Sequence, residues 1–311
     1  MDKKIIFMGT PIFAANILEE LIAAGYKIDL VVSQPDKKVG RKQLLTPTPV
    51  KEVAVKHNID VFQPARIRED FQPIVDFNPD LIITAAYGQI VPDQVLNSPK
   101  IECINVHGSL LPKYRGGAPI HFSVLNGDEK TGVTIMKMVS KMDAGAIISQ
   151  AEFPIEENDT TADVHDKMIG VGANLLLNTL PSIFDGTYTL TEQDEEQVTY
   201  SPNISKEQER IIWTKTAKEV HNQIRGLSTW PGAYTNLDSK RFKIYMSNLT
   251  DIDSTGNPGT IASVTDETIY VNCNDKQIKL IKVQPAGKKQ METRDFVRGI
   301  DKQAFLGKVF E

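Results

Sequence analysis

The sequence predicts a doubly wound α/β domain with a mostly parallel sheet, followed by a small β-barrel domain. Short apolar runs alternate with stretches of helical periodicity through the first half of the chain, and short strands alternate with turn residues after position 233. A length of 311 residues suits two domains. The chain has 41% hydrophobic and 24% charged residues, and this globular composition excludes wholesale disorder and fibrous classes.

The elements of the first domain follow in order from these patterns. A strand at 4–8 precedes a helix that ends at Gly25, and the run at 80–86 is apolar almost throughout, which indicates burial on both faces of a parallel sheet. Further strands are expected at 28–32, 101–107, 131–138 and 146–153, with an extended link at 60–62. Helices are expected around Val53 and Val55, at 66–77 and at 160–184. Together these elements predict a Rossmann-like sheet over residues 1–185.

The pattern changes at Gly186. Residues 186–205 have little apolar periodicity and are interpreted as a linker. A helix over 217–227 then precedes short strands that are separated by turn signals such as Asn257-Pro258-Gly259. Regularly spaced short strands predict a small barrel, so residues 206–311 are assigned to an OB-like domain.

Charge is divided unevenly along the chain. Residues 206–311 contain 17 Lys and Arg against 13 Asp and Glu, a net of +4, and the whole chain has a net charge of −5, which leaves −9 for residues 1–205. This division suggests an anionic partner for the second half, with a chance split as the alternative. No apolar run approaches the ~18–20 residues that span a bilayer, so no membrane association is expected. Two isolated cysteines, Cys103 and Cys273, suit neither a disulfide framework nor a zinc site, and we expect a cytoplasmic protein.

Candidate catalytic residues lie at the end of the 101–107 strand. Side chains alternate along a strand, so Cys103, Asn105 and His107 share one face, and ligands of open α/β sheets bind beyond the carboxyl ends of strands. An amide can donate to an oxyanion and an imidazole can transfer a proton near neutral pH, which suits acyl transfer. The alternative is a helix cap and a structural histidine. Cys103 lies deeper in the strand and is expected to be a buried bystander.

Other segments argue against two common kinds of nucleotide-binding site. Residues 109–119 lack the spacing of a P-loop, and Gly9-Thr10-Pro11 lacks the GxGxxG pattern of a dinucleotide site. Asp143 lies between two predicted strands and two positions before Gly145, a pattern typical of a turn former.

The run from Cys103 to Pro112, Cys-Ile-Asn-Val-His-Gly-Ser-Leu-Leu-Pro, with Tyr114-Arg115-Gly116 after it, resembles the signature of the 10-formyltetrahydrofolate-dependent formyltransferases. Asp143-Ala144-Gly145 is similar to the Asp-x-Gly of that family. The resemblance implies a catalytic trio of Asn105, His107 and Asp143. It also implies a folate site that is lined by Ser109, Leu110, Leu111 and Pro112, and partly by the loop at 87–92 with Gln89, Ile90 and Val91.

Three further segments resemble the members of this family that act on methionyl-tRNA. They are 34–51, Trp230-Pro231-Gly232-Ala233 and 284–291, and with them the resemblance covers essentially the whole chain. It implies 10-formyltetrahydrofolate and initiator methionyl-tRNA as substrates, with the formyl group passing to the α-amine of the methionyl group. No metal is expected, and the protein is expected to be a monomer.

The segment 34–49 is the expected tRNA-binding loop. It carries four cations, Lys37, Lys38, Arg41 and Lys42. Taken alone, such a run is usually a solvated face, but together with a basic second domain it fits a nucleic-acid ligand. Glycine and prolines in and beside it, Pro35, Gly40, Pro47 and Pro49, are expected to keep it irregular and mobile until tRNA binds.

Two competing functions stay open from the sequence. The first is a formyltransferase that acts on an amino sugar or a purine intermediate, which needs neither a basic loop nor a basic second domain. The second is a non-catalytic RNA-binding protein with a decayed enzyme domain, against which the intact Asn105, His107 and Asp143 argue.

Overall fold

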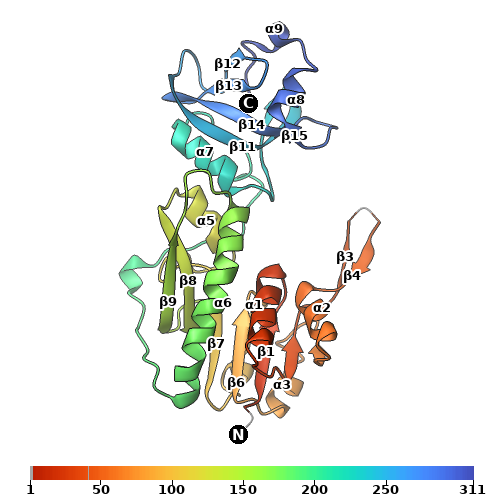
Figure 1. Ribbon diagram of the computed structural model, residues 1–311, viewed down its shortest axis with the longest axis vertical. Helices are drawn as coiled ribbons and strands as arrows, with labels where there is room; N and C mark the ends of the chain where they lie inside the picture. The colour runs from red at the N-terminus through yellow and green to blue at the C-terminus, as the bar shows by residue number, and fades with distance from the viewer. Residues whose placement is uncertain (1–2, 41) are drawn as a thin grey trace. The chain divides into compact units, whose positions relative to one another are not determined.

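The computed structural model describes residues 3–40 and 42–311, which form two compact units (Figure 1). The first unit contains the chain up to Gly116, Thr131–Phe153 and His165–Ser201. The second contains Gly117–Lys130, Pro154–Val164 and Pro202–Glu311. The domain limits expected at 185 and 206 stay predictions, because compactness alone does not establish independent folding.

A seven-stranded sheet in the order β5-β2-β1-β6-β7-β8-β9 forms the first unit. The strands from β5 to β7 are parallel, and β8 runs antiparallel to β7. Their bounds are β1 Ile5–Gly9, β2 Leu30–Val32, β5 Val61–Phe62, β6 Leu81–Ala85, β7 Glu102–His107, β8 Lys130–Lys137 and β9 Ile147–Pro154. The order reverses at β1, and ligands of such sheets bind at the carboxyl ends beside this reversal. The predicted mostly parallel sheet is confirmed.

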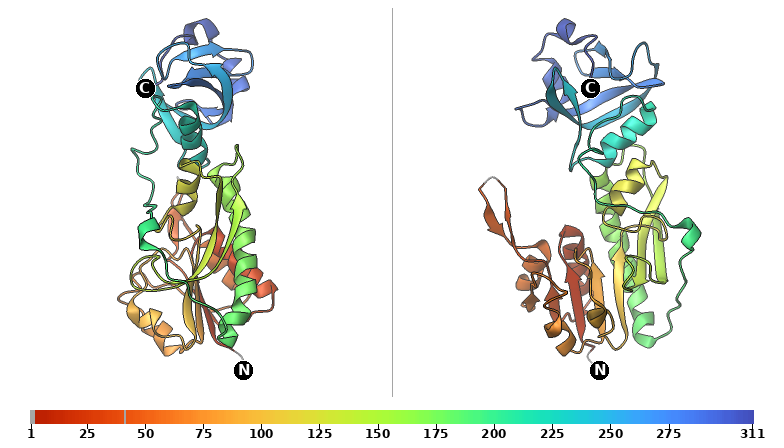
Figure 2. Two further views of the ribbon diagram at one scale, coloured as in Figure 1. Left: turned by 90° about the vertical axis from the view of Figure 1, so that its left-hand side faces the viewer. Right: turned by 180° about the vertical axis from the view of Figure 1, so that it is seen from behind.

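Helices cover both faces of this sheet. Figures 1 and 2 show α1 (Ile12–Ala23) and the long α6 (Thr161–Asp185) on one face. On the other face, Ile74 of α3 (Gln72–Asp76) and Val95 of α4 (Asp93–Leu96) share a buried cluster with Ile6, Ile82 and Cys103. The doubly wound arrangement is therefore confirmed, and α2 (Pro49–Lys56) follows the second strand as expected.

The helix expected at 66–77 is shorter in the structure, where α3 spans only Gln72–Asp76. Residues 66–70 form a turn, and the Ile67 amide in it donates to the side chain of Gln89 at 2.8 Å. Pro73 is tolerated in the first turn of a helix because its missing N–H has no partner there, whereas inside a helix over 66–77 it would remove a hydrogen bond and clash with the preceding turn.

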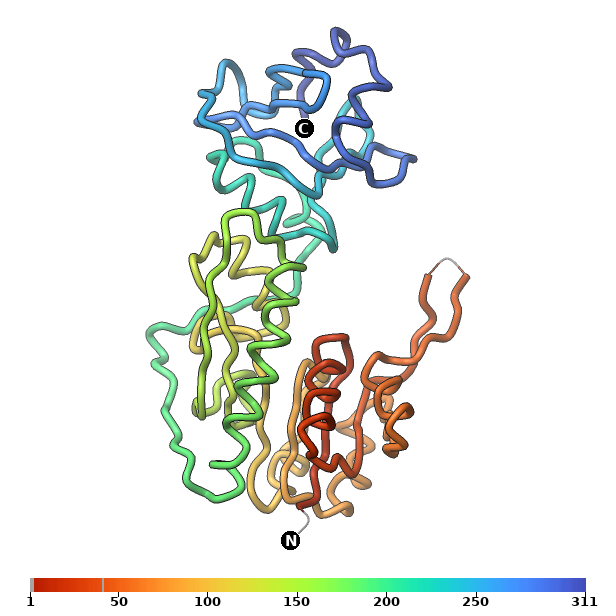
Figure 3. The backbone as a smooth tube through the Cα atoms, in the orientation of Figure 1, coloured from red at the N-terminus to blue at the C-terminus, as the bar shows by residue number. Residues whose placement is uncertain are grey.

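The segment 34–49 contains regular structure, so the expectation of an irregular loop is wrong. Residues Lys37–Val39 (β3) and Leu44–Thr46 (β4) pair as an antiparallel hairpin that projects beyond α2 (Figure 3). Gly40 and Gln43 have positive φ angles that suit the turn, and the prolines lie outside the paired residues. Arg41 lies outside the described residues.

Residues 191–201, expected as part of a linker, are hydrogen-bonded to the first unit, and we call them the strap. Near its start, Thr191 pairs with Ile147, and at its end the Ser201 amide donates to the carbonyl oxygen of Arg115. A short 3-10 helix, Glu195–Gln197, interrupts the otherwise extended chain. Figure 2 shows the strap following α6 and running back past the sheet.

The second unit is built on an antiparallel sheet in the order β10-β11-β14-β13-β12, with β15 paired to β14. The strands are β10 Ala233–Leu237, β11 Lys240–Asp253, β12 Ile261–Val264, β13 Ile269–Asn272, β14 Lys276–Gln284 and β15 Met291–Glu292. Its helices are α5 Pro119–Leu125, α7 Ala217–Gly226, α8 Thr293–Val297 and α9 Lys302–Phe305. Trp213, Phe242, Phe296 and Phe310 pack together in its core. A small antiparallel β domain after the parallel sheet is thus confirmed.

Both cysteines, Cys103 and Cys273, are buried, and neither forms a disulfide bond. Among the described residues, no helix is long and apolar enough to cross a membrane.

Candidate active site

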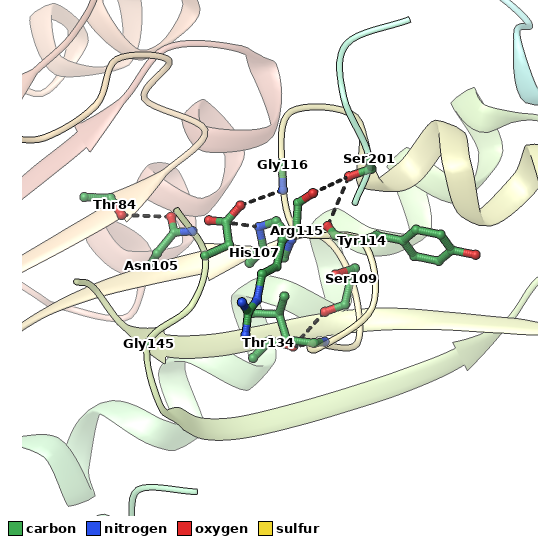
Figure 4. Close-up of polar contacts among 12 residues, drawn as sticks. Thr84, Asn105, His107, Ser109, Tyr114, Arg115, Gly116, Thr134, Gly145 and Ser201 are labelled. Carbon is green, nitrogen blue, oxygen red and sulfur yellow. Dashed lines mark hydrogen bonds and ion pairs between the residues drawn. The ribbon is translucent and has the colours of Figure 1, made fainter. Parts of the chain in front are cut away.

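Asn105 lies near the carboxyl end of β7, opposite Thr84 of the parallel neighbour β6. The buried Thr84 hydroxyl is 2.8 Å from Asn105 Oδ1 and 3.0 Å from the carbonyl oxygen of Ile104 (Figure 4). The hydroxyl has a single proton and its shortest contact is with Oδ1; a hydrogen bond there leaves the amide nitrogen of Asn105 as the donor end of the side chain. An amide fixed in this orientation can stabilise negative charge on a reacting oxygen.

His107 ends β7 on the same face as Asn105 and is 6% exposed. Its Nε2 is 3.0 Å from the carbonyl oxygen of Tyr114, and its Nδ1 is 3.7 Å from Oδ1 of Asp143 (Figure 4). A carbonyl oxygen only accepts, so Nε2 carries a proton and the neutral ring has its lone pair on Nδ1. Nδ1 can therefore take up a proton beside the Asp143 carboxylate, with which it then forms an ion pair.

Asp143 occupies the turn between β8 and β9 with a φ of +50°. Its Oδ2 accepts a 2.8 Å hydrogen bond from the amide of Gly116, which leaves Oδ1 toward His107. Gly145 permits the turn, since a Cβ atom at this position would be 1.8 Å from the carbonyl oxygen of Lys137. Asp143 is a turn residue, and the same turn places its carboxylate beside the imidazole.

The strap fixes the backbone next to this carboxylate. The Arg115 amide donates to Thr199 at 2.9 Å, and the Ser201 amide donates to Arg115 at 2.8 Å. Gly116 has a φ of +121°, and a Cβ atom there would be 2.8 Å from the carbonyl oxygen of Ser201. The close approach of the strap therefore requires glycine beside Arg115.

A buried polar network joins the strap to the Asp143 turn. Gln193 Nε2 donates to the carbonyl oxygens of Asp143 and Gly145, each at 2.8 Å, and Gln193 Oε1 accepts from Arg115 Nε at 3.0 Å. Arg115 is fully buried, and its Nη2 is 2.8 Å from Glu195 Oε1. Hydrogen bonds from Arg115 and then Lys141 hold the pKa of the Glu195 carboxyl below its usual range.

The segment expected to line the folate site, residues 109–112, forms a turn after β7. Thr134 of β8 donates to the Ser109 carbonyl at 2.7 Å and accepts from the Leu111 amide at 3.1 Å. Ser109 is buried, with its hydroxyl 2.6 Å from the Lys113 carbonyl. Thus Ser109 and Leu111 shape the turn from inside, whereas Leu110 and Pro112 are partly exposed.

The second expected part of the folate site follows the adjacent strand β6. Gln89 Oε1 accepts the Ile67 amide at 2.8 Å, so this side chain ties two loops together. Ile90 is exposed, whereas Val91 belongs to the core under α3 and α4. Because β6 and β7 are parallel neighbours, this loop and residues 109–112 leave the same edge of the sheet.

Three of the four expected tRNA-binding cations, Lys37, Lys38 and Lys42, lie on the hairpin β3–β4, and the fourth, Arg41, lies outside the described residues. Lys37, Lys38 and Lys42 are exposed, as are Val39, Leu44 and Leu45. At the base of the hairpin, Asp36 is bound by Gln63 at 2.8 Å and by Lys51 at 2.6 Å, and these bonds, Gln63 first, lower the pKa of its carboxyl. The contacts of Asp36 therefore anchor the base of the hairpin, whereas the side chains of Lys37, Lys38 and Lys42 are exposed to solvent.

Sequence reasoning missed Thr84, Thr134 and Gln193. Each acts through side-chain hydrogen bonds to a segment distant in sequence, and ordinary Thr or Gln residues carry no local signal for this. Within the part of the chain that the structure describes, no group of three or more His, Cys, Asp or Glu side chains is placed to hold a metal ion.

Comparisons with known proteins agree with this geometry. Residues 3–180 match the Formyl transferase family, and residues 203–301 match the Formyl transferase, C-terminal domain family. The chain is 50% identical over 304 residues to the methionyl-tRNA formyltransferase of Bacillus subtilis, covering 97% of this chain and 96% of that protein.

The chain belongs to the methionyl-tRNA formyltransferase family.

The chain is also 48% identical over 300 residues to the methionyl-tRNA formyltransferase of Enterococcus faecalis, and the match covers 96% of this chain and 96% of that protein. Solved structures show the same fold at lower identity. An N-formyltransferase from Helicobacter canadensis, solved with folinic acid and dTDP-3-aminofucose, has a TM-score of 0.71 at 24% identity, covering 91% of this chain and 99% of that one. The sugar formyltransferase WlaRD has a TM-score of 0.69 at 22% identity, with coverage of 93% and 100%. At these identities the likeness concerns the fold.

Proposed function

We propose that this protein transfers the formyl group of 10-formyltetrahydrofolate to the α-amino group of methionyl initiator tRNA, giving N-formylmethionyl-tRNA. The observation that carries the proposal is the meeting of an oriented amide, Asn105, with the His107–Asp143 pair at one edge of the sheet. Membership of the methionyl-tRNA formyltransferase family over nearly the whole chain supports the choice of substrates.

The reaction divides into two steps. The α-amine attacks the formyl carbon, a C–N bond forms, and the carbonyl electrons move to oxygen, where the Asn105 amide donates a hydrogen bond. The ammonium proton passes to His107 Nδ1, and the imidazolium is stabilised by Asp143. The oxyanion electrons then re-form the carbonyl as the bond between the formyl carbon and N10 breaks, N10 takes that bond's electrons and the proton held by His107, and tetrahydrofolate leaves.

The same proposal assigns binding roles. The folate lies against residues 109–112 and the loop at 87–92, which leave the same sheet edge as His107. The exposed Lys37, Lys38 and Lys42, together with Arg41 of the same segment of the sequence, bind the phosphates of tRNA. The net charge of +4 in residues 206–311 supports a second region of interaction with the nucleic acid.

A single assay tests the proposal. The protein is incubated with 10-formyltetrahydrofolate and, separately, with charged initiator tRNA, free methionine and an amino-sugar nucleotide. Formylation of charged tRNA at a kcat/KM well above that of the other acceptors supports the proposal. Preference for the sugar nucleotide would assign the chain to small-molecule formylation, and turnover with none of the acceptors would favour a non-catalytic RNA-binding role.

A further inference from the structure

We infer that Gln193 is a positioning residue for the proposed reaction: its side-chain amide holds the turn at 143–145 so that the Asp143 carboxylate faces His107. The inference rests on the proposed function. It concerns a strap residue that lies outside the signature segments and far from them in sequence.

The hydrogen bonds of Gln193 are concentrated on this turn. Both N–H groups of one buried amide are used, one on the carbonyl of Asp143 and one on that of Gly145, each at 2.8 Å. These carbonyls belong to the first and third residues of Asp-Ala-Gly, so the amide clamps the turn across its width. Asp143 has a φ of +50°, a conformation that non-glycine residues rarely adopt, and the clamp counters its tendency to relax.

The orientation of the Gln193 amide is itself determined by a charged group. Arg115 Nε donates to Oε1 at 3.0 Å, so the oxygen must face the guanidinium and the nitrogen must face the turn. Arg115 is in turn held by Glu195, which Lys141 also contacts at 3.0 Å. The amide therefore cannot exchange its donor and acceptor ends without losing all three hydrogen bonds.

The strap has other attachments that do not involve the Gln193 side chain. The Arg115 amide bonds to Thr199, the Ser201 amide bonds to Arg115, and Thr191 pairs with Ile147. Loss of the Gln193 amide therefore frees the Asp143 turn while the strap stays in place. A purely structural role predicts instead that all these bonds weaken together.

Gln193→Met keeps the side-chain length and removes both donors, and it also removes the oxygen that accepts from Arg115 Nε, which Gln193→Glu retains. The reporter is the Gly116 amide, which donates to Asp143 Oδ2 at 2.8 Å, and the internal reference is the Arg115 amide, which donates to Thr199. We expect hydrogen exchange at Gly116 to accelerate about tenfold or more while exchange at Arg115 stays within about threefold. We expect kcat to fall about 10- to 100-fold, with KM for folate and for tRNA within about threefold, because misplacement acts on the transition state.

Two further variants complete the test. Gln193→Glu keeps the bond from Arg115 but places a carboxylate oxygen, which cannot donate, against the two carbonyl oxygens of the turn. We expect the same fall in kcat as for Gln193→Met. Gln197→Met is the matched control, since the Gln197 side chain bonds locally, to Asp194 at 2.7 Å, and not to the turn at 143–145 among the described residues. It should leave kcat unchanged, and hydrogen exchange at the Gly116 and Arg115 amides should be unchanged as well.

A double-mutant cycle shows whether Gln193 acts through Asp143. In an Asp143→Asn background, Gln193→Met should lower kcat by less than about threefold more, because the group that it positions is already gone. The inference would be overturned if the two substitutions lowered kcat independently of each other. It would also be overturned if Gln193→Met left the hydrogen-exchange rate of the Gly116 amide unchanged, or accelerated exchange equally at Gly116 and Arg115. If the wild-type protein does not formylate methionyl-tRNA, the proposed function fails, whereas exchange at Gly116 still decides whether Gln193 holds the turn.

Discussion

The Thr84 hydroxyl donates a 2.8 Å hydrogen bond to Oδ1 of Asn105 from the neighbouring parallel strand. This bond distinguishes the two ends of the amide and directs its nitrogen to the site. Thr84 is 2% exposed, so water does not compete for the hydroxyl. The strand register, which pairs these two residues, therefore prepares the oxyanion donor before substrate binds.

Thr84→Val tests this arrangement, since valine keeps the shape of threonine and removes the hydroxyl. We expect kcat to fall about tenfold, because the amide then rotates more freely, with KM for folate little changed. Steady-state kinetics and a melting curve are the measurements. Unchanged kcat in a folded variant would show that Asn105 does not depend on Thr84.

Asn105→Ala and His107→Ala should each lower kcat by about 10² or more, since an oxyanion donor and a proton-transfer group act mainly in the transition state. Asn105 is partly exposed and His107 lies at the end of its strand, so we expect modest effects on folding. Either variant that keeps more than about a tenth of wild-type kcat contradicts its assigned role.

Asp143→Asn separates the charge of this side chain from its place in the turn. Asparagine tolerates the φ of +50°, so the variant should fold normally and bind folate within a few-fold. Most of the activity should be lost, because the imidazolium of His107 loses its carboxylate partner. Kinetics and folate binding are measured on the same preparation, and near-normal turnover would leave Asp143 with a turn-forming role alone.

The cations of the segment 34–49 should serve tRNA and not folate. Alanine at Lys37, Lys38, Arg41 or Lys42 should raise KM for charged tRNA and reduce its salt dependence by roughly one unit in log–log slope for each phosphate that is no longer neutralised. KM for folate should hardly change. Kinetics at two salt concentrations distinguish this from a solvated surface, for which neither the tRNA parameters nor their slope would move.

Stability should fall with decreasing pH through His221 in the second unit. This side chain is buried between Ser247 Oγ, at 3.0 Å from Nδ1, and the Glu157 carbonyl, at 3.1 Å from Nε2. Burial, and secondarily the charge of Arg225, lower its pKa, whereas Glu157 acts in the opposite direction.

The folded protein therefore favours the neutral ring, and the unfolded chain takes up the proton more readily. The stabilisation is complete above the unfolded value of about 6.5 and is lost as the pH falls through the lowered pKa. Urea unfolding at several pH values, with His221→Gln as the non-titrating comparison, measures this. Equal pH dependence in both proteins would show that His221 does not contribute.

Local patterns in the sequence were enough for much of the fold. The period of two along β7 places Asn105 and His107 on one face wherever the strand lies, and apolar runs with helical spacing between them identify a parallel sheet. Local residue preferences predicted the secondary structure less reliably at 34–49 and 66–77. Gly40 and Gln43 close a hairpin that the prolines were expected to prevent, and the helix expected at 66–77 is confined to Gln72–Asp76, with Pro73 in its first turn.

Only the tertiary structure decided what surrounds the two residues at the end of β7. Asp143 reaches His107 because Gly145 allows a tight turn against Lys137, and Gln193 reaches that turn because the chain returns past the sheet after α6. The sequence by itself determined the strand that carries Asn105 and His107, since alternation depends on neighbouring residues alone. The hydrogen bonds that orient them join residues far apart in the chain, and such pairings exist only once the sheet has formed and brought those residues together.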